Sequence, residues 1–541
     1  MKKILYLFVF TLTVFTSCKK DKAGEPDLGL HGYGPMSFAT GDVISIYGNG
    51  FDSNPQNNKV TFNGVPGEVA TATPNRLQVI VPAIASNGTI KVQVGGKTVI
   101  SDLAYSLLTV LQGTIVDNTI LTADKKYLLR GEVIFNNKLI IQAGTVILGE
   151  KLTHASVTAS DIGIEGTADK PVIFTSDQPV NSRQPGDWGG VTIKAGERSL
   201  PNGILKYMRV EYAGYHASGK TGVALALNMD ASSTYSNIQV SYSQGDAFNI
   251  NSVVEYTGSD VEYALGRYFV AFACAGTDFK INGPYIVLQY ALGLKDPYNA
   301  DVSLGQGIFV MGAPVRLSNI TLIGYYPSAR GIKSISPGYP LSNNAGRGVQ
   351  IGGYSNLTNG TGYYIPNTSK VSLYNSVIAG SWLSGVSIFG RDTWNNYAQP
   401  SIYGAIDLFN NYITGGAPAQ YPFRGGAFSL ENATSPGSGF ENIRNDAKNT
   451  RFAADNDTTK MLQPDAGKDD LGIAGLANYN MLGHPNLLPK TGSVLLQGAK
   501  FPSGSPVDIP LINKDIKFVG AFGTEDWTAG WCNFNPQITK Y

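Results

Sequence analysis

The sequence predicts an all-β protein with a small β-sandwich followed by a large parallel β-helix. Short apolar runs alternate with Gly, Asn and Pro turns, and no helical period separates them. The chain contains 64 Gly, with 43% hydrophobic and only 15% charged residues, which excludes intrinsic disorder. One strand pattern that begins at Gly307 recurs at Gly348, Gly385 and Gly426, at a spacing typical of stacked repeats.

Residues 1–17 have the composition of an export signal. A basic start precedes an apolar run at 4–15, which is too short to span a bilayer, and small residues lead to Cys18. This arrangement resembles a bacterial lipoprotein signal. The resemblance implies that Cys18 is lipidated and that 18–31 form the lipidated cysteine and a linker. The alternative is an ordinary secretory signal that leaves Cys18 as a free thiol.

The charged run Lys19–Lys22 is similar to the export signals of surface lipoproteins in Bacteroidetes. The resemblance implies an outer-membrane protein that is displayed on the cell surface, and the alternative is the periplasmic face of that membrane. No second apolar stretch approaches spanning length, so we expect membrane contact only through the lipid anchor.

Residues 32–110 alternate short apolar strands with Asn-Gly and Gly-Gly turns, which predicts a β-sandwich. The phrases Gly48-Asn49-Gly50-Phe51 and Val79-Ile80-Val81-Pro82 resemble the IPT/TIG immunoglobulin-like family. The resemblance implies an Ig-like fold and a spacer function, with direct ligand binding as the alternative.

Residues 111–541 contain two recurring strand types. One has a Gly-apolar-x-apolar pattern, and the other carries an asparagine that we expect at a bend, bonded to its copies above and below. This predicts a parallel β-helix. A propeller needs even spacing, which the gaps lack, and a large β-sandwich is the other competitor. The strands begin at Gly190, Gly222, Gly307, Gly348, Gly385 and Gly426, and at Asn319, Asn375 and Asn411.

Three phrases in this part, Gly166–Phe174, Gly186–Val191 and Val519–Trp531, are similar to pectin-lyase-like β-helix lipoproteins of Bacteroidetes. The resemblance implies a right-handed helix with a C-terminal cap. It also implies structural roles for the tryptophans within the phrases, Trp188, Trp527 and Trp531.

The sequence contains no recognisable catalytic arrangement, so no catalytic residue is predicted. Asp469-Asp470, Gly483-His484-Pro485 and Arg330-Gly331-Ile332-Lys333 do not form the motifs of pectin hydrolases, and the four histidines are dispersed. No cofactor is expected, although Asp455-Asn456-Asp457 leaves a structural calcium ion open.

The charge balance and the cysteines give two further expectations. The net charge of +1 gives no reason to expect a nucleic-acid partner. Cys274 lies in an apolar run and is expected in the core, whereas the role of Cys532 is open.

Loops between the repeating strands are rich in aromatic and amide side chains, and insertions at equivalent points of a solenoid emerge on one side. Sugars bind by stacking on aromatic rings and hydrogen bonding to amides and hydroxyls. The alternative is that these aromatics pack within their own loops. The loops contribute Trp394, Tyr397, Tyr354, Tyr363, Tyr364, Tyr339, Asn395 and Asn396 as candidate ligand-binding residues, with Trp394 first, and also Tyr325 and Tyr326.

These features favour a surface lipoprotein whose β-helix binds an extracellular polysaccharide without cleaving it. Balanced charge favours a neutral glycan. An outer-membrane glycan import complex is a candidate partner. The alternatives are a β-helix polysaccharide lyase or glycoside hydrolase, and an adhesin that recognises a protein or cell surface.

Overall fold

A computed structural model describes residues 27–35, 38–194, 203–216, 222–254, 262–295, 305–312, 314–324, 347–352, 371–379, 384–389, 406–413, 428–431, 460–461, 473, 483–501 and 511–541. The chain divides into two compact units between Leu108 and Thr109. Within the described ranges, no helix is long and apolar enough to cross a membrane. Both units are built from strands, which confirms the predicted all-β class.

The first unit is an antiparallel sandwich whose seven strands follow the order β1-β2-β5-β4-β3-β6-β7. Alternate residues of each strand face one core, in which Phe38, Phe62 and Tyr105 contact one another through their rings. The strands are β1 (Gly29–Gly34), β2 (Val43–Asn49), β3 (Asn58–Phe62), β4 (Val65–Thr73), β5 (Arg76–Ile80), β6 (Ile90–Val94) and β7 (Lys97–Ile100), with a short 3-10 helix η1 (Pro55–Asn57) before β3.

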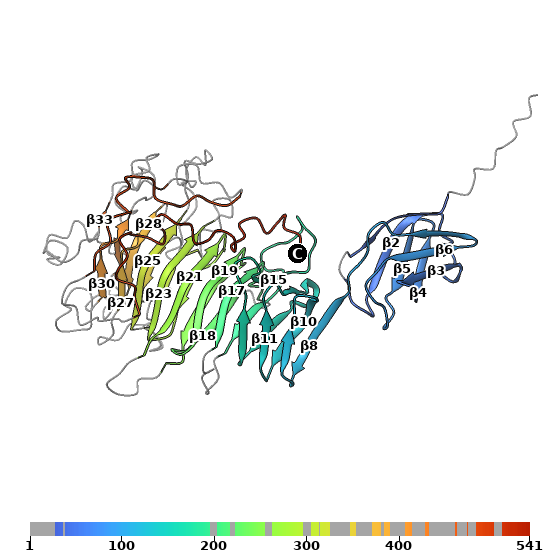
Figure 1. Ribbon diagram of the computed structural model, residues 1–541, viewed down its shortest axis with the longest axis horizontal. Helices are drawn as coiled ribbons and strands as arrows, with labels where there is room; N and C mark the ends of the chain where they lie inside the picture. Colours follow the sequence, from blue (N-terminus) through green and yellow to red (C-terminus); the bar gives the residue numbers. More distant parts are fainter. Residues whose placement is uncertain are drawn as a thin grey trace, which may run out of the picture. The chain divides into compact units, whose positions relative to one another are not determined.

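The second unit is a parallel β-helix, in which each strand pairs with its equivalents in the coils before and after it (Figure 1). The pairs form three sheets, which we number in chain order within one coil. Five long strands cross from sheet 1 to sheet 2: β17 (Ile204–Glu211), β19 (Thr234–Ser241), β21 (Ala264–Phe272), β23 (Ile286–Leu294) and β25 (Val315–Ile323).

Strand β10 (Lys126–Phe135) runs from sheet 2 to sheet 3, and β8 (Leu108–Ile115) pairs with it. Each of the remaining strands belongs to a single sheet. Sheet 1 adds β9 (Thr119–Leu121), β11 (Leu139–Gln142), β14 (Ile162–Glu165), β27 (Val371–Tyr374) and β30 (Ile406–Phe409). Sheet 2 adds β12 (Val146–Gly149), β15 (Val172–Ser176), β28 (Val377–Ala379), β31 (Tyr412–Ile413) and β33 (Lys460–Met461).

Sheet 3 contains β13 (Ser156–Ala159), β16 (Gly190–Ile193), β18 (Val223–Met229), β20 (Asp246–Ser252), β22 (Phe279–Ile281), β24 (Ile308–Val310), β26 (Arg347–Ile351), β29 (Ser384–Phe389) and β32 (Phe428–Glu431). A second 3-10 helix, η2 (Lys151–Thr153), precedes β13. The predicted Gly strands therefore all lie in sheet 3, and their inward residues, such as Leu225 and Ile308, join one continuous core.

A column of bends joins sheet 1 to sheet 2. One residue of each coil adopts the left-handed conformation there, and the strand register places these residues one above another. We call them the bend column: Tyr207, Asn237, Tyr268, Tyr290, Asn319, Asn375 and Asn410. The predicted bends at Asn319 and Asn375 are confirmed, but the third was predicted one residue too late, because the register pairs Asn410 and not Asn411 with Asn375.

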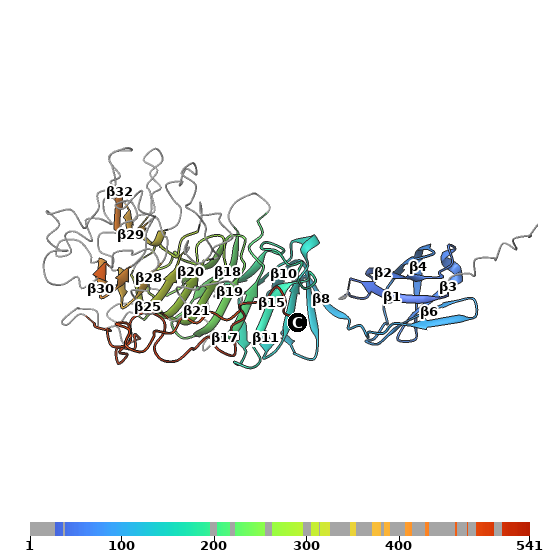
Figure 2. The same cartoon turned by 90° about the horizontal axis from the view of Figure 1, so that it is seen from above.

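The last part of the chain runs back along the β-helix over the outer face of sheet 2 (Figures 1 and 2). We call residues 483–501 and 511–541 the C-terminal segment. Its apolar residues pack against outward side chains of sheet 2, for example Val519 and Phe522 against the cluster that includes Leu292 and Val377. The predicted C-terminal cap falls on this part of the chain, whose described residues cover a side of the helix.

Candidate functional site

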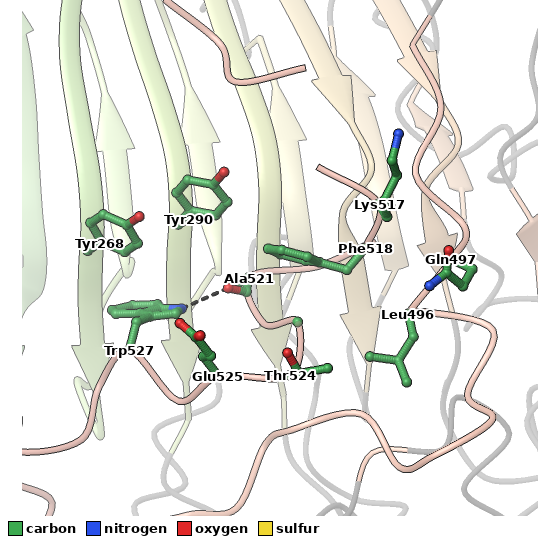
Figure 3. A pocket seen from close by; sticks show the side chains of 11 residues that line it. Tyr268, Tyr290, Leu496, Gln497, Lys517, Phe518, Ala521, Thr524, Glu525 and Trp527 are labelled. Atoms are coloured by element: carbon green, nitrogen blue, oxygen red, sulfur yellow. Dashed lines mark hydrogen bonds between the residues drawn. The ribbon is translucent and has the colours of Figure 1, made fainter. Parts of the chain in front are cut away.

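An aromatic cleft lies between the bend column and the C-terminal segment (Figure 3). Its volume is about 420 Å³, within the range of small-molecule sites. β21 and β23 contribute one wall through Tyr268 and Tyr290. The C-terminal segment contributes the rest: Leu496, Gln497, Lys517, Phe518, Ala521, Gly523, Thr524, Glu525 and Trp527.

The rings of the cleft form a row. Tyr268 and Tyr290 occupy neighbouring coils, and their rings stack with centroids 5.1 Å apart. Trp527 packs against Tyr268 at 5.2 Å, and Phe518 against Tyr290 at 6.1 Å. Tyr290 is buried, whereas Tyr268, Phe518 and Trp527 are half-buried and so keep part of their surface for a ligand.

The two tyrosines are held in an unusual backbone conformation. Their φ angles are +61° and +60°, a region that costs most residues with a side chain about 1–2 kcal/mol and that Asn tolerates better. Stacking between coils offsets part of this cost, since aromatic pairs contribute about 0.5–1.5 kcal/mol beyond their buried area. At the opposite corner of sheet 2, Tyr212 and Tyr242 also combine a left-handed backbone with ring stacking, at 5.4 Å. Both are buried, and neither lines the cleft.

Polar groups surround the rings. Gln497, Lys517, Thr524 and Glu525 are exposed around the cleft. Burial raises the pKa of the Tyr268 phenol and of the Tyr290 phenol, so both stay neutral hydroxyls at physiological pH. The cleft therefore combines aromatic surface with hydrogen-bonding groups.

Glu525 is the one carboxylate among the residues that line the cleft. The neighbouring Asp526 is already occupied, because its Oδ2 lies 2.7 Å from His484 Nε2 and its Oδ1 accepts from the Thr528 amide at 3.0 Å. These contacts hold the pKa of Asp526 below its usual value despite its burial. In the described part of the chain, no three His, Cys, Asp or Glu side chains group as metal ligands.

The structure leaves the predicted ligand-binding residues untested. Trp394, Tyr397, Tyr354, Tyr363, Tyr364, Tyr339, Asn395 and Asn396, with Tyr325 and Tyr326, lie outside the described residues. Cys18 and Asp455-Asn456-Asp457 lie outside them as well.

Sequence reasoning missed the cleft residues. Tyr268 and Tyr290 carry no turn signal of their own, and only their register with the Asn bends identifies them. Trp527 was assigned a structural role, and its indole N–H does donate to the Ala521 carbonyl at 2.7 Å, but its ring also lines the cleft.

The other two tryptophans of the shared phrases are structural, as predicted. Trp188 is fully buried and donates to the Glu211 carbonyl at 2.8 Å. A Cβ at Gly149 would lie 2.5 Å from the Trp188 ring, so only glycine fits there. Trp531 is buried and donates to the Trp527 carbonyl at 2.7 Å.

Both cysteines of the second unit are free thiols. Cys274 is buried in the core, as predicted, and burial raises its pKa to about 12, which makes it unreactive. Burial likewise raises the pKa of Cys532 well above its ordinary value.

Family comparisons match one stretch of each unit. Residues 30–109 match the IPT/TIG domain, and residues 113–200 match the pectate-lyase-like β-helix domain. No curated protein matches the chain. The pairing of these two domains fits a carbohydrate-related protein.

Solved structures share only short stretches with this chain. An auxiliary nutrient binding protein from Bacteroides ovatus is 24% identical over 15% of this chain and 21% of its own, with a TM-score of 0.15. One from Bacteroides thetaiotaomicron is 24% identical over 17% and 24%, also at 0.15. A Gamma-CGTASE from Alkalophilic bacillus clarkii is 22% identical over 18% and 15%, at 0.13. This chain thus spans about a fifth of the first relative.

Proposed function

We propose that this protein binds an extracellular neutral polysaccharide without cleaving it, and that the aromatic cleft is a binding site. The observation that carries the proposal is the convergence of half-buried rings and exposed polar side chains in one cleft. The C–H faces of a sugar pack on aromatic surface while its hydroxyls bond to amides, hydroxyls and charged groups. Phe518 and Trp527 supply the first kind of contact, and Gln497, Thr524 and the tyrosine hydroxyls supply the second.

The charge of the cleft favours a neutral ligand. Lys517 and Glu525 are its two charged side chains, and they carry opposite signs. A polyuronate would meet no net positive field there, whereas a neutral glycan needs none. The net charge of +1 for the whole chain supports the same choice.

A glycoside hydrolase is the second candidate, and Glu525 is the observation in its favour. Hydrolases of the usual kind need two carboxyl groups about 5–10 Å apart, of which one is free to act on the glycosidic oxygen and one on the anomeric carbon or a water. Glu525 supplies one such group. Asp526, the next carboxylate along the chain, is held by His484 and Thr528, so the binding function fits the cleft better.

The proposal includes the place of the protein. Lipidation at Cys18 would anchor the chain to the outer membrane, on the cell surface, with the IPT/TIG domain as a spacer and a glycan import complex as a partner. Replacing Cys18 by Ala is expected to abolish the incorporation of labelled fatty acid into the protein. A variant that still carries the label would refute lipidation at Cys18.

Affinity electrophoresis of the soluble form, residues 19–541, tests the binding function. The gels would contain neutral or acidic polysaccharides, and reducing-end and unsaturated products would be measured in the same samples. Retardation by a neutral glycan without product is expected. Product release would favour the enzyme. The absence of both retardation and product would favour an adhesin.

Variants would locate the site. Phe518→Ala is expected to weaken retention about tenfold, which corresponds to ~1.4 kcal/mol, because it removes a ring from the cleft and leaves the backbone bond at residue 518 intact. Tyr47→Ala, which removes a 48% exposed ring of the sandwich, is the matched control. If Trp394→Ala abolishes retention and Phe518→Ala does not, the site lies in the loops predicted from the sequence.

A further inference from the structure

We infer that Asn319 and Thr321 of β25 are positioning residues that set the shape of the aromatic cleft from behind. Neither residue is among those that line it. Each instead holds the backbone of the C-terminal segment next to an aromatic residue of the cleft. The inference rests on the proposed binding function for its effect on the ligand, but the geometry it describes is testable without a ligand.

Thr321 controls Trp527 through two hydrogen bonds in series. The Ala521 amide donates to Thr321 Oγ1 at 2.8 Å, and the Ala521 carbonyl accepts from the indole N–H of Trp527 at 2.7 Å. A change at Thr321 therefore shifts the acceptor that orients the indole ring.

The hydroxyl of Thr321 is a polar group between apolar neighbours in sheet 2. The register places it between Leu292 and Val377, whose side chains belong to the apolar cluster under the C-terminal segment. Thr321 is 3% exposed, so the Ala521 amide would have no solvent to replace a lost bond. A buried amide without a partner costs about 1–3 kcal/mol.

Contact at this point is also close. Gly520 has a φ of +85°, and a Cβ there would lie 2.8 Å from Thr321 Oγ1. A side chain at residue 520 would therefore collide with Thr321, and only glycine lets the C-terminal segment approach β25 this closely.

Asn319 controls Phe518 in the same way. Its Nδ2 donates to the Phe518 carbonyl at 2.9 Å, while its Oδ1 accepts from Ser318 Oγ at 2.7 Å, which fixes the orientation of the amide. Asn319 follows Tyr290 in the bend column, so this bond aligns Phe518 with the Tyr290 ring.

The C-terminal segment needs these bonds because residues 511–541 form no strand. A further clamp lies one coil earlier, where the side-chain amide of Gln289 donates to the Asn513 carbonyl at 3.1 Å and accepts from its amide at 3.0 Å. A wall without strand pairing takes its position from such side-chain contacts together with single backbone bonds, such as that from the Gly520 amide to the Asn375 carbonyl at 2.7 Å. A cleft that is held loosely binds poorly.

Two substitutions at Thr321 test the inference. Thr321→Val keeps the shape and removes the acceptor, whereas Thr321→Ser keeps the acceptor. The first is expected to weaken glycan retention about tenfold, as one unsatisfied buried amide implies, and the second to retain wild-type binding. Asn319→Gly, which keeps the left-handed bend but removes the amide, is expected to act like Thr321→Val.

Thr145→Val is the matched control, because Thr145 is a fully buried threonine of an early coil whose hydroxyl donates to the Gln142 carbonyl at 2.7 Å. It loses a buried hydroxyl bond as well, yet it is expected to leave retention unchanged. Loss of retention in Thr145→Val to the same extent would overturn the inference, because the effect would then be one of general stability.

Hydrogen exchange of peptides that cover residues 518–527 gives a readout that needs no ligand. Exchange is expected to rise in Thr321→Val and Asn319→Gly and not in Thr321→Ser or Thr145→Val. If wild-type protein retains no glycan but exchange follows this pattern, the proposed function fails and the positioning role stands. Unchanged exchange together with unchanged retention in Thr321→Val would overturn the positioning role.

Discussion

The two halves of the bend column have the same backbone and different chemistry. Asn319, Asn375 and Asn410 occupy one half, and Tyr207, Tyr268 and Tyr290, interrupted by Asn237, occupy the other. All are left-handed at similar φ angles. We call these the Asn half and the Tyr half.

The Asn half uses its side chains to hold the C-terminal segment. Asn375 Oδ1 accepts from the Lys500 amide at 2.9 Å and from Asn410 Nδ2 at 2.6 Å, and Asn410 Nδ2 also donates to the Gly498 carbonyl at 2.7 Å. The Tyr half meets the same segment through rings and leaves a cleft. In this column the asparagines hold the segment, while Tyr268 and Tyr290, which suit the left-handed bend less well, line the candidate site.

Among the substitutions that test this comparison, Asn375→Ala should have the largest effect on stability. It removes two hydrogen bonds and places an ordinary side chain at a φ of +48°, so a loss of about 3 kcal/mol of unfolding free energy is expected. Chemical denaturation would measure it. Asn375→Gly, which keeps the conformation and removes only the amide, should lose less, and equal losses would show that the left-handed bend contributes nothing.

Much of this architecture could be predicted from the sequence because its signals are local. Gly190, Gly307 and Gly348 lie at or next to the start of strands that the pattern identified, and these strands stack in one sheet. The bends at Asn319 and Asn375 followed from the tolerance of Asn for left-handed backbone. The slip to Asn411 arose because two asparagines are adjacent, and only pairing with the next coil decides between them.

The cleft could not be predicted, because no local pattern specifies it. Tyr268 and Tyr290 become a pair only through the register of β21 and β23, and tyrosine is no signal for a bend. Phe518 and Trp527 reach them by docking of a distant segment without periodicity. Tertiary contacts of that kind are absent from short-range propensity.

Substitutions at Tyr268 test whether the two halves of the bend column differ in backbone strain. Tyr268→Asn converts a Tyr bend into an Asn bend, and Tyr268→Ala keeps neither the ring nor the tolerance for left-handed backbone. Both variants should lose glycan retention, but the free energy of unfolding of Tyr268→Asn should exceed that of Tyr268→Ala by about 1 kcal/mol. Thermal unfolding of the two variants would measure the difference. A less stable Asn variant would mean that the backbone of Tyr268 carries no strain.

The smallest expected effect concerns alkaline pH, at which the phenols of Tyr268 and Tyr290 can ionise, whereas the amides of the Asn half cannot. Burial raises the pKa of the Tyr268 and Tyr290 phenols, so the folded state holds these protons more tightly than the unfolded chain. Their contribution to stability is complete below pH 10 and is lost as pH rises from there through the folded values. The double variant Tyr268→Phe, Tyr290→Phe should therefore lose less Tm than the wild type between pH 8 and pH 11. An identical decline in Tm at alkaline pH in the double variant and the wild type would show that the two phenols ionise as easily in the folded protein as in the unfolded chain. The cleft would then be more exposed to solvent than the packing of the two tyrosines against Trp527 and Phe518 implies.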